Sequence, residues 1–195
     1  MDSIKKEAFN KLTAIRDLKV EQVNDWFDER LGYITTVSKD FEIRSLDKPL
    51  LKTYQNMKDN EIISNARKIL NRYLKNYTDY VELFIINPFS GIVEISTDPS
   101  QEGKDNSEEI YFIEPLKKSV PYIKGVYFSK TLNKPSISFS VPINCQYHNG
   151  DHIIGVLVAT IDPDRSLYPL LLNRTGMGET GEALILNKDR MALNE

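Results

Sequence analysis

The sequence has a single cysteine, no long apolar run and no excess of basic residues, and each absence excludes a class of protein. One cysteine, Cys145, rules out an internal disulfide and a cysteine metal cluster. No segment reaches 18 consecutive apolar residues, so we expect none of these 195 residues to span a membrane. The net charge of −3 argues against a nucleic-acid partner, because such proteins usually carry a basic patch.

Proline is absent from the first 47 residues, and glycine occurs there only once, as Gly32. Apolar residues recur in this stretch at helical spacing, which predicts one continuous helix over about residues 2–47. At 1.5 Å per residue the helix would be roughly 65–70 Å long, longer than a domain of this size is wide. Its apolar stripe needs a second surface to cover it. The candidates for that surface are a second domain, a partner helix and a continuation toward a membrane, and we expect residues 1–48 to form a long helix that pairs in a homodimer through this stripe.

Beyond residue 48, amphipathic segments alternate with segments rich in β-branched and aromatic residues. Helices are predicted over 59–77, 108–119 and 164–174, the second with Ser107 as its N-cap. Strands are predicted over 80–86, 92–97, 122–129, 136–144 and 152–161, and a last hairpin begins at Glu182. Consecutive hairpins need no crossover helices, so the five strands should form an antiparallel sheet. The fold class is therefore α+β.

Four stretches of the chain stand out together. They are LTAIRDLKVEQVNDWFDERLGYITTVSKD, LFIINPFSGIVEISTDPSQEGKDNSEEIYF, SISFSVPI followed across a turn by HIIGVLVATID, and RTGMGETGEALILNKD. In this order and at these spacings, over about residues 12–190, they resemble the double Cache family, also described as tandem PAS-like or PDC sensor domains. The resemblance implies a long N-terminal helix packed on a PAS-like five-stranded antiparallel sheet with flanking helices. It also implies a membrane-distal ligand-binding module over 49–162, then a linker helix and the incomplete start of a second module over 163–195.

The function implied by this resemblance is that of an extracytoplasmic small-molecule sensor domain in a protein of the cell membrane, in the first place a two-component histidine kinase. The alternatives are the sensor domain of a methyl-accepting chemoreceptor and a dimerisation module without a ligand. We expect no enzymatic activity from the domain and no cofactor. The flanking transmembrane helices would lie outside these residues, whose first stretch, MDSIKKEAFNKL, is too polar for a signal peptide.

Amino-acid-sensing relatives carry an Arg-x-Trp-Tyr stretch, then Tyr-x-Asp, then an aspartate in the last strand. The residues that align here are Glu109-Ile-Tyr111-Phe112, Tyr127-Phe-Ser129 and Thr160. The arginine that would hold a carboxylate is absent, and hydroxyls replace both aspartates that would hold an ammonium, which argues against an amino-acid ligand. The candidate pocket residues are Tyr111, Tyr127, Ser129, Ser138 and Thr160. They predict apolar walls with neutral hydrogen-bonding groups, suited to a small neutral or weakly charged ligand. The tyrosines also fit a packed core with satisfied hydroxyls.

Other motifs in the chain fail the test of their structural context. Gly176-Met-Gly178-Glu-Thr-Gly181 matches G-x-G-x-x-G, but a helix precedes it and a strand follows, the reverse of a dinucleotide site. A linker turn that needs positive φ angles explains these glycines better. No acidic spacing matches a calcium loop, and no nucleophile and base form a catalytic pattern, so we predict neither a metal site nor a hydrolase.

Overall fold

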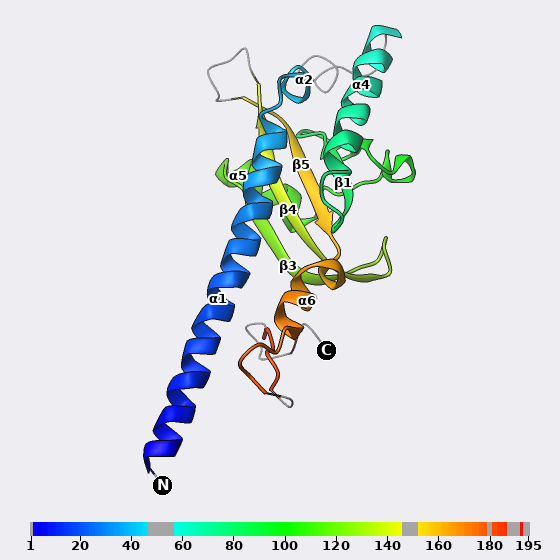
Figure 1. The fold of residues 1–195 in the computed structure, drawn as a ribbon. Helices are drawn as coiled ribbons and strands as arrows, with labels where there is room; N and C mark the ends of the chain where they lie inside the picture. Colours follow the sequence, from blue (N-terminus) through cyan, green and yellow to red (C-terminus); the bar gives the residue numbers. More distant parts are fainter. Residues whose placement is uncertain (1, 47–56, 146–151, 179–180, 187–191, 193–195) are drawn as a thin grey trace. The chain divides into compact units, whose positions relative to one another are not determined.

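A five-stranded antiparallel sheet forms the centre of residues 30–162, which confirms the predicted fold class (Figure 1). The computed structural model describes residues 2–46, 57–145, 152–178, 181–186 and 192. The strands are β1 (Tyr80–Ile86), β2 (Val93–Ser96), β3 (Tyr122–Ser129), β4 (Lys134–Asn144) and β5 (Ile153–Ile161). Their spatial order is β2-β1-β5-β4-β3.

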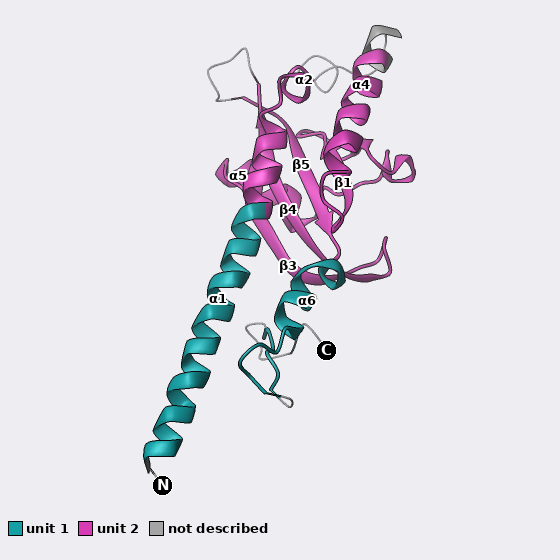
Figure 2. Cartoon of the chain, viewed as in Figure 1, with its two compact units in different colours: residues 1–29, 163–195 teal, residues 30–162 magenta. Residues whose placement is uncertain are grey.

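The chain divides into two compact units, one of residues 30–162 and the other of residues 1–29 with 163–195 (Figure 2). The boundary falls inside helix α1 (Asp2–Ser38), between Glu29 and Arg30. The larger unit contains the whole sheet together with helices α2 (Phe41–Arg44), α4 (Met57–Leu74) and α5 (Ile110–Lys118).

Strand register decides which side chains share a face of the sheet. Glu82 on β1 and Ser138 on β4 both lie opposite Thr160 on β5, so the three side chains point to one side. Helix α5 packs on this side, where its Tyr111 and Phe112 join a buried cluster with Phe84, Ile86, Val93, Val156 and Val158. On the opposite face, the central strands carry the buried apolar residues Leu83, Ile85, Phe139, Leu157 and Ala159. The buried polar side chains Glu82, Ser138 and Thr160 of the central strands therefore lie on the α5 side.

Strand β3 is irregular at the point where it crosses the polar end of this face. Lys124 pairs with Ser138, whereas Tyr127 pairs with Ser136, so the two residues of β3 between these pairs oppose a single residue of β4. Residues three apart in a regular strand would point to opposite faces, but the bulge brings Lys124 and Tyr127 to the same face. Gly125 lies inside the bulge, and glycine within a strand often marks such a distortion.

Helix α1 ends at Ser38, so the prediction of one helix to about residue 47 is wrong at its C-terminal end. In its last turns the hydroxyls of Thr35 and Thr36 donate to the carbonyls of Leu31 and Gly32, at 2.7 and 2.9 Å. Such side-chain bonds compete with the helical ladder. The chain then restarts as α2, where the Asp40 carboxylate accepts from the Glu42 amide and caps the new helix.

Three other boundaries differ from expectation. Helix α4 begins and ends earlier than the predicted 59–77, and α5 begins at Ile110. The N-cap of α5 is Glu109 and not Ser107, because the Ser107 amide donates to the carboxylate of Asp105 and turns the loop before the helix starts. A 3₁₀ helix, η1 (Pro99–Gln101), forms where we expected only a polar loop, capped by the side chain of Asp98.

In the smaller unit, the N-terminal part of α1 contacts the segment after residue 162. The Trp26 indole donates to Ser166 Oγ at 3.1 Å, and Lys19 Nζ donates to the Leu170 carbonyl at 2.6 Å. The predicted helix 164–174 is divided into η2 (Pro163–Arg165) and α6 (Leu167–Leu172), because the Ser166 backbone between them is not helical, with φ of −147°.

The glycine cluster after α6 is a turn, as expected. Gly176 and Gly178 have φ of 81° and 78°, the left-handed region that glycine alone enters without strain. Of the predicted last hairpin, Leu186 and Ala192 form an isolated antiparallel bridge, and the residues between them lie outside the described part of the chain. Among the described helices, none combines the length and apolarity required to cross a bilayer.

Candidate functional site

A small cavity of about 50 Å³ lies on the α5 side of the sheet, where the polar residues of β1, β3 and β5 meet. Its walls come from four strands (β1, β2, β3 and β5), from α5, from the segment 101–106 that begins with the last residue of η1, and from the start of the β3–β4 turn. The lining residues are Glu82, Phe84, Val93, Gln101, Lys104, Asn106, Tyr111, Tyr127, Ser129, Thr131, Leu132 and Thr160.

Four of the five residues expected in the pocket line this cavity: Tyr111, Tyr127, Ser129 and Thr160. The fifth, Ser138, is fully buried behind it. The Ser138 hydroxyl is 2.8 Å from the Tyr127 hydroxyl and 3.5 Å from Thr160 Oγ1, so it links two lining residues without facing the cavity itself. Burial raises the pKa of Tyr127, which therefore keeps its proton and can both donate and accept a hydrogen bond.

Glu82 is the cavity residue that sequence reasoning missed. Its residue surface is only 6% exposed, yet the structure gives it no cationic partner within the described residues. Ser96 Oγ donates to Glu82 Oε1 at 2.6 Å, and that is the one hydrogen bond made by the carboxylate among the residues described. Burial raises the pKa of Glu82 above its ordinary value, and the bond from Ser96 opposes only part of the shift.

A network on the β2 side fixes the position of the Ser96 hydroxyl. Ser96 Oγ accepts from the Asp98 amide at 2.9 Å, so its proton is directed toward Glu82. The Ser96 amide donates to Glu102 Oε1, and the Arg67 guanidinium binds both oxygens of the same carboxylate at 2.7 and 2.8 Å. Helix α4, which carries Arg67, thus helps to hold the wall of the cavity in place.

The aromatic side of the site already holds a cation that belongs to the protein. Lys124 Nζ lies 4.0 Å from the ring centroid of Tyr127 and 5.1 Å from that of Tyr111. The same ammonium donates to Glu109 Oε2 at 2.7 Å. Burial and the nearby Glu109 carboxylate raise the pKa of Tyr111, so both phenols present neutral, electron-rich rings.

The expectation of uncharged walls is therefore wrong, because Glu82 and Lys104 line the cavity. The sequence did contain a signal. Glu82 is the single charged residue in the apolar run Tyr80–Ile86, and alternation places it on the same face as Tyr80, Phe84 and Ile86. A lone carboxylate on a buried face needs a partner, a ligand or a proton. The position of Lys124 was hidden by the bulge in β3, which no regular strand pattern predicts.

A larger groove of about 350 Å³ lies in the smaller unit, between the first half of α1 and the C-terminal segment. Its walls are mostly apolar and include Leu12, Ile15, Val23, Leu171 and Ile185. None of the predicted pocket residues lines it. Within the described residues, no group of three or more histidine, cysteine or acidic side chains is placed to hold a metal ion.

The chain is similar in sequence and fold to known sensor domains. A family model described as a Cache domain matches residues 1–194. No curated protein matches the chain. Among solved structures, the sensory domain of the Campylobacter jejuni chemoreceptor Tlp3 with isoleucine bound is similar, with a TM-score of 0.68 and 19% identity. The match covers 91% of this chain and 66% of that one, so the chain spans slightly less than two thirds of its length.

Two further structures are similar in the same way. The ligand-binding domain of the Pseudomonas fluorescens chemoreceptor CtaA in complex with L-isoleucine has a TM-score of 0.69 and 14% identity, over 100% of this chain and 71% of that one. The sensor domain of the Vibrio cholerae histidine kinase DctB has a TM-score of 0.61 and 16% identity, over 82% of this chain and 58% of that one. Identities this low establish a shared fold and carry no ligand from one protein to another.

Proposed function

The chain belongs to the Cache domain family, and from that premise we propose that it is the extracytoplasmic small-molecule sensor domain of a transmembrane signalling protein. A two-component histidine kinase is the output that we favour, and a methyl-accepting chemoreceptor is the alternative. Similar folds occur in receptors of both kinds, as the DctB and Tlp3 domains illustrate. The output domain would follow the sensor on the other side of the membrane.

The observation that carries this proposal is the cavity between α5 and the sheet. Protein interiors are close-packed, and a polar void at the end of an apolar core is costly unless water or a ligand occupies it. Here the void is surrounded by groups that can orient a guest: the Glu82 carboxylate, the Thr160 and Ser129 hydroxyls and the faces of two tyrosines. Such a mixture of apolar walls and a few polar groups is typical of ligand sites.

The three parts of the chain take different roles in this proposal. Residues 49–162 bind the ligand, residues 1–48 carry the signal and pair with a second copy, and residues 163–195 lead into a second module. Pairing is supported by the exposed apolar side chains along the first half of α1, which include Ile4, Phe9, Leu12 and Leu18. Sedimentation equilibrium should find a dimer that Phe9→Glu and Leu18→Glu weaken. A wild-type chain that stays monomeric at high micromolar concentration would contradict this role.

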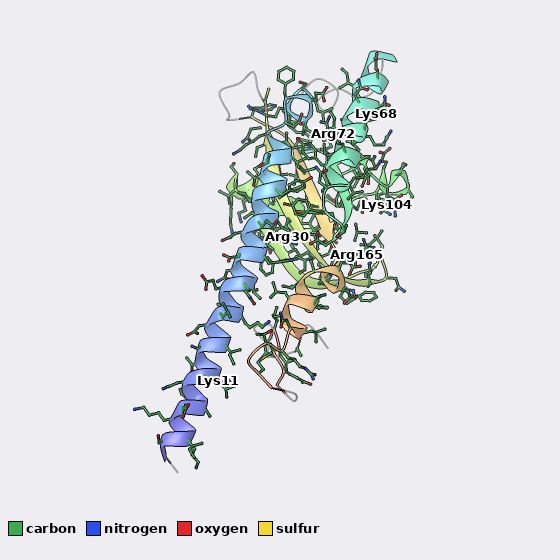
Figure 3. All side chains as sticks on the ribbon, viewed as in Figure 1. Lys11, Arg30, Lys68, Arg72, Lys104 and Arg165 are labelled. Carbon is green, nitrogen blue, oxygen red and sulfur yellow. The ribbon has the colours of Figure 1, made fainter. Side chains whose placement is uncertain are left out.

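Ligand binding would signal by shifting an equilibrium between two arrangements of the helix and the sheet. A guest larger than the present cavity must displace the turn after β3 or the segment 101–106, and both are wall elements. A ligand shifts the equilibrium only by the difference in its affinity for the two arrangements. Arg30 on α1, labelled in Figure 3, forms an ion pair with Asp79 at the start of β1 and so joins the helix to the sheet.

A screen of small metabolites by thermal shift tests this function. A ligand should raise the melting temperature of the wild type, and both Tyr127→Ala and Thr160→Val should reduce the shift, because each removes a wall group of the cavity. Thr36→Val, on the exposed side of α1, is the matched control and should keep the full response. If both pocket variants respond as the wild type does, the site has been misplaced.

One observation favours the second candidate, a dimerisation module without a ligand. The cavity is small, and the hydroxyls of Tyr127, Ser138 and Thr160 already lie close enough to bond to one another. A core that satisfies its own polar groups needs no guest. The same screen separates the two functions. A dimer that no compound stabilises would support the module without a ligand.

A further inference from the structure

We propose that the ligand of this pocket is a small primary amine, whose ammonium group pairs with Glu82 at the base of the cavity. The inference rests on the proposed sensor function and adds the chemical class of the ligand. It depends on the carboxylate, on the aromatic walls and on the placement of the other charges around the site.

The carboxylate of Glu82 has one oxygen that the protein leaves for a guest. Oε1 accepts from Ser96, whereas Oε2 makes no hydrogen bond with any residue in the described part of the chain. Every completely buried side-chain oxygen or nitrogen among the described residues has a partner. Oε2 is therefore not sealed in the core, and because Glu82 lines the cavity, this oxygen opens onto it. A buried carboxylate with a free oxygen binds a hydrogen-bond donor, and it binds a charged donor most strongly.

The surroundings supply the remaining partners of an ammonium group, which has three donors and no acceptor. Thr160 is the register neighbour of Glu82 across β1 and β5, so its hydroxyl lies on the same face beside the carboxylate. Ser129 adds a second hydroxyl to the wall. The Tyr111 and Tyr127 rings already accept the Lys124 ammonium on their faces, which demonstrates that this wall tolerates a cation.

Neither lysine near the site, Lys104 or Lys124, forms an ion pair with Glu82. Lys124 pairs with Glu109, and Lys104 is exposed with its Nζ donating to Gln101 Oε1 at 2.9 Å. Figure 3 labels Lys104 on the segment that follows β2. Lys104 lines the cavity from an exposed position, and in the proposed binding mode it faces the end of the ligand away from the ammonium. A hydroxyl or carboxylate at that end is therefore compatible with the site, whereas a second ammonium is disfavoured by repulsion.

Isothermal titration of the 195-residue chain with four probes of similar size tests the inference. The probes are n-propylammonium, 1-propanol, propionate and β-alanine, which differ in charge and in the presence of the amine. Both amines should bind saturably, and the alcohol and the anion at least tenfold more weakly. This is the ratio expected for one charge-assisted hydrogen bond. A stronger response to β-alanine than to propylammonium would place a carboxylate beside Lys104 and would still support the amine class.

The decisive variant is Glu82→Gln, which removes the charge and keeps the shape of the side chain. It should weaken amine binding at least tenfold. Glu108→Gln, an equal change of charge at an exposed position outside the cavity wall, should bind as the wild type does. If Glu82→Gln fails to fold, the pH dependence of amine binding by the wild type replaces it. The affinity for the amine should fall as acid protonates Glu82. The charged groups that act on Glu82 are Asp98 and Lys104, and the neutral Tyr111 and Tyr127 line the same cavity.

Failure of this inference differs from failure of the sensor function. Amines that do not saturate the wild type, equal binding to Glu82→Gln, or tighter binding of propionate would each overturn the amine assignment. If the metabolite screen then yields a ligand without an amine whose effect is lost in Tyr127→Ala, the sensor function stands. If no compound of any class stabilises the wild type, the sensor function is rejected as well.

Discussion

Removal of Asp79 should destabilise the larger unit more than any change at a surface ion pair. Arg30 Nε and Nη2 bind Asp79 Oδ2 at 3.0 and 2.8 Å, and the two side chains are only 9% and 4% exposed. In Asp79→Ala the guanidinium stays buried without this carboxylate, which typically costs about 3–5 kcal/mol. Domains of this size are stable by about 5–15 kcal/mol, so the loss is a large fraction of the total. Urea unfolding followed by circular dichroism measures it directly.

The control is Asp17→Ala, which removes a pair that is geometrically shorter but exposed. Arg16 Nη2 lies 2.6 Å from Asp17 Oδ1, with side chains 67% and 62% exposed. Water and salt screen such a pair, so we expect a change of no more than about 0.5 kcal/mol. If burial decides the energy, the two variants differ severalfold. A loss below about 1 kcal/mol in Asp79→Ala, or equal losses in both variants, would refute the reasoning.

Three other predictions concern the cavity and the turn beside it. Because burial raises the pKa of Glu82 above 4.5, the folded chain binds this proton more tightly than the unfolded chain. Stability of the wild type relative to Glu82→Gln should therefore fall as the pH rises above 4.5, and a constant difference in unfolding free energy would contradict the shift. Ser96→Ala removes the donor to Glu82 and should cost about 1–3 kcal/mol at neutral pH by urea unfolding, and no loss would mean that the bond is dispensable. Gly91 and Gly103 both have positive φ, but a Cβ at Gly91 would lie 2.5 Å from the Ser107 Cβ, whereas Gly103 faces open space. In the same assay Gly91→Ala should lower the free energy of unfolding by about 1–3 kcal/mol more than Gly103→Ala does, and equal losses would exclude the steric clash.

The sheet was predictable because its strands have the residue composition and the flanking turn residues that are typical of buried strands. Apolar β-branched and aromatic runs bounded by turn residues placed all five strands to within about two residues, and β3 was predicted over its observed range. Short connections between most of the strands gave the antiparallel arrangement. Helix ends were less predictable. The end of α1 depends on the hydroxyl groups of Thr35 and Thr36 and on the cap at Asp40, whose hydrogen bonds compete with those of a continued helix.

The candidate site was predictable where the family resemblance supplied positions, and not where it depended on tertiary detail. Tyr111, Tyr127, Ser129 and Thr160 meet around one cavity, and Ser138 connects two of them from behind. Glu82 lies on a strand that carries none of the residues aligned with the relatives, and only the register with Thr160 brings it to the site. Lys124 reaches the tyrosine faces because a bulge reverses its orientation, and a regular alternation predicts the opposite face for it.

The central claim is that a small molecule sits between α5 and the sheet. A crystal structure of the chain with a compound from the thermal-shift screen tests it most directly. The account predicts ligand density enclosed by Tyr111, Tyr127 and Thr160, with a nitrogen atom in hydrogen-bond contact with Glu82 Oε2. Density that lies instead in the apolar groove beside Leu12 and Leu171, with the cavity at Glu82 unchanged, would contradict it.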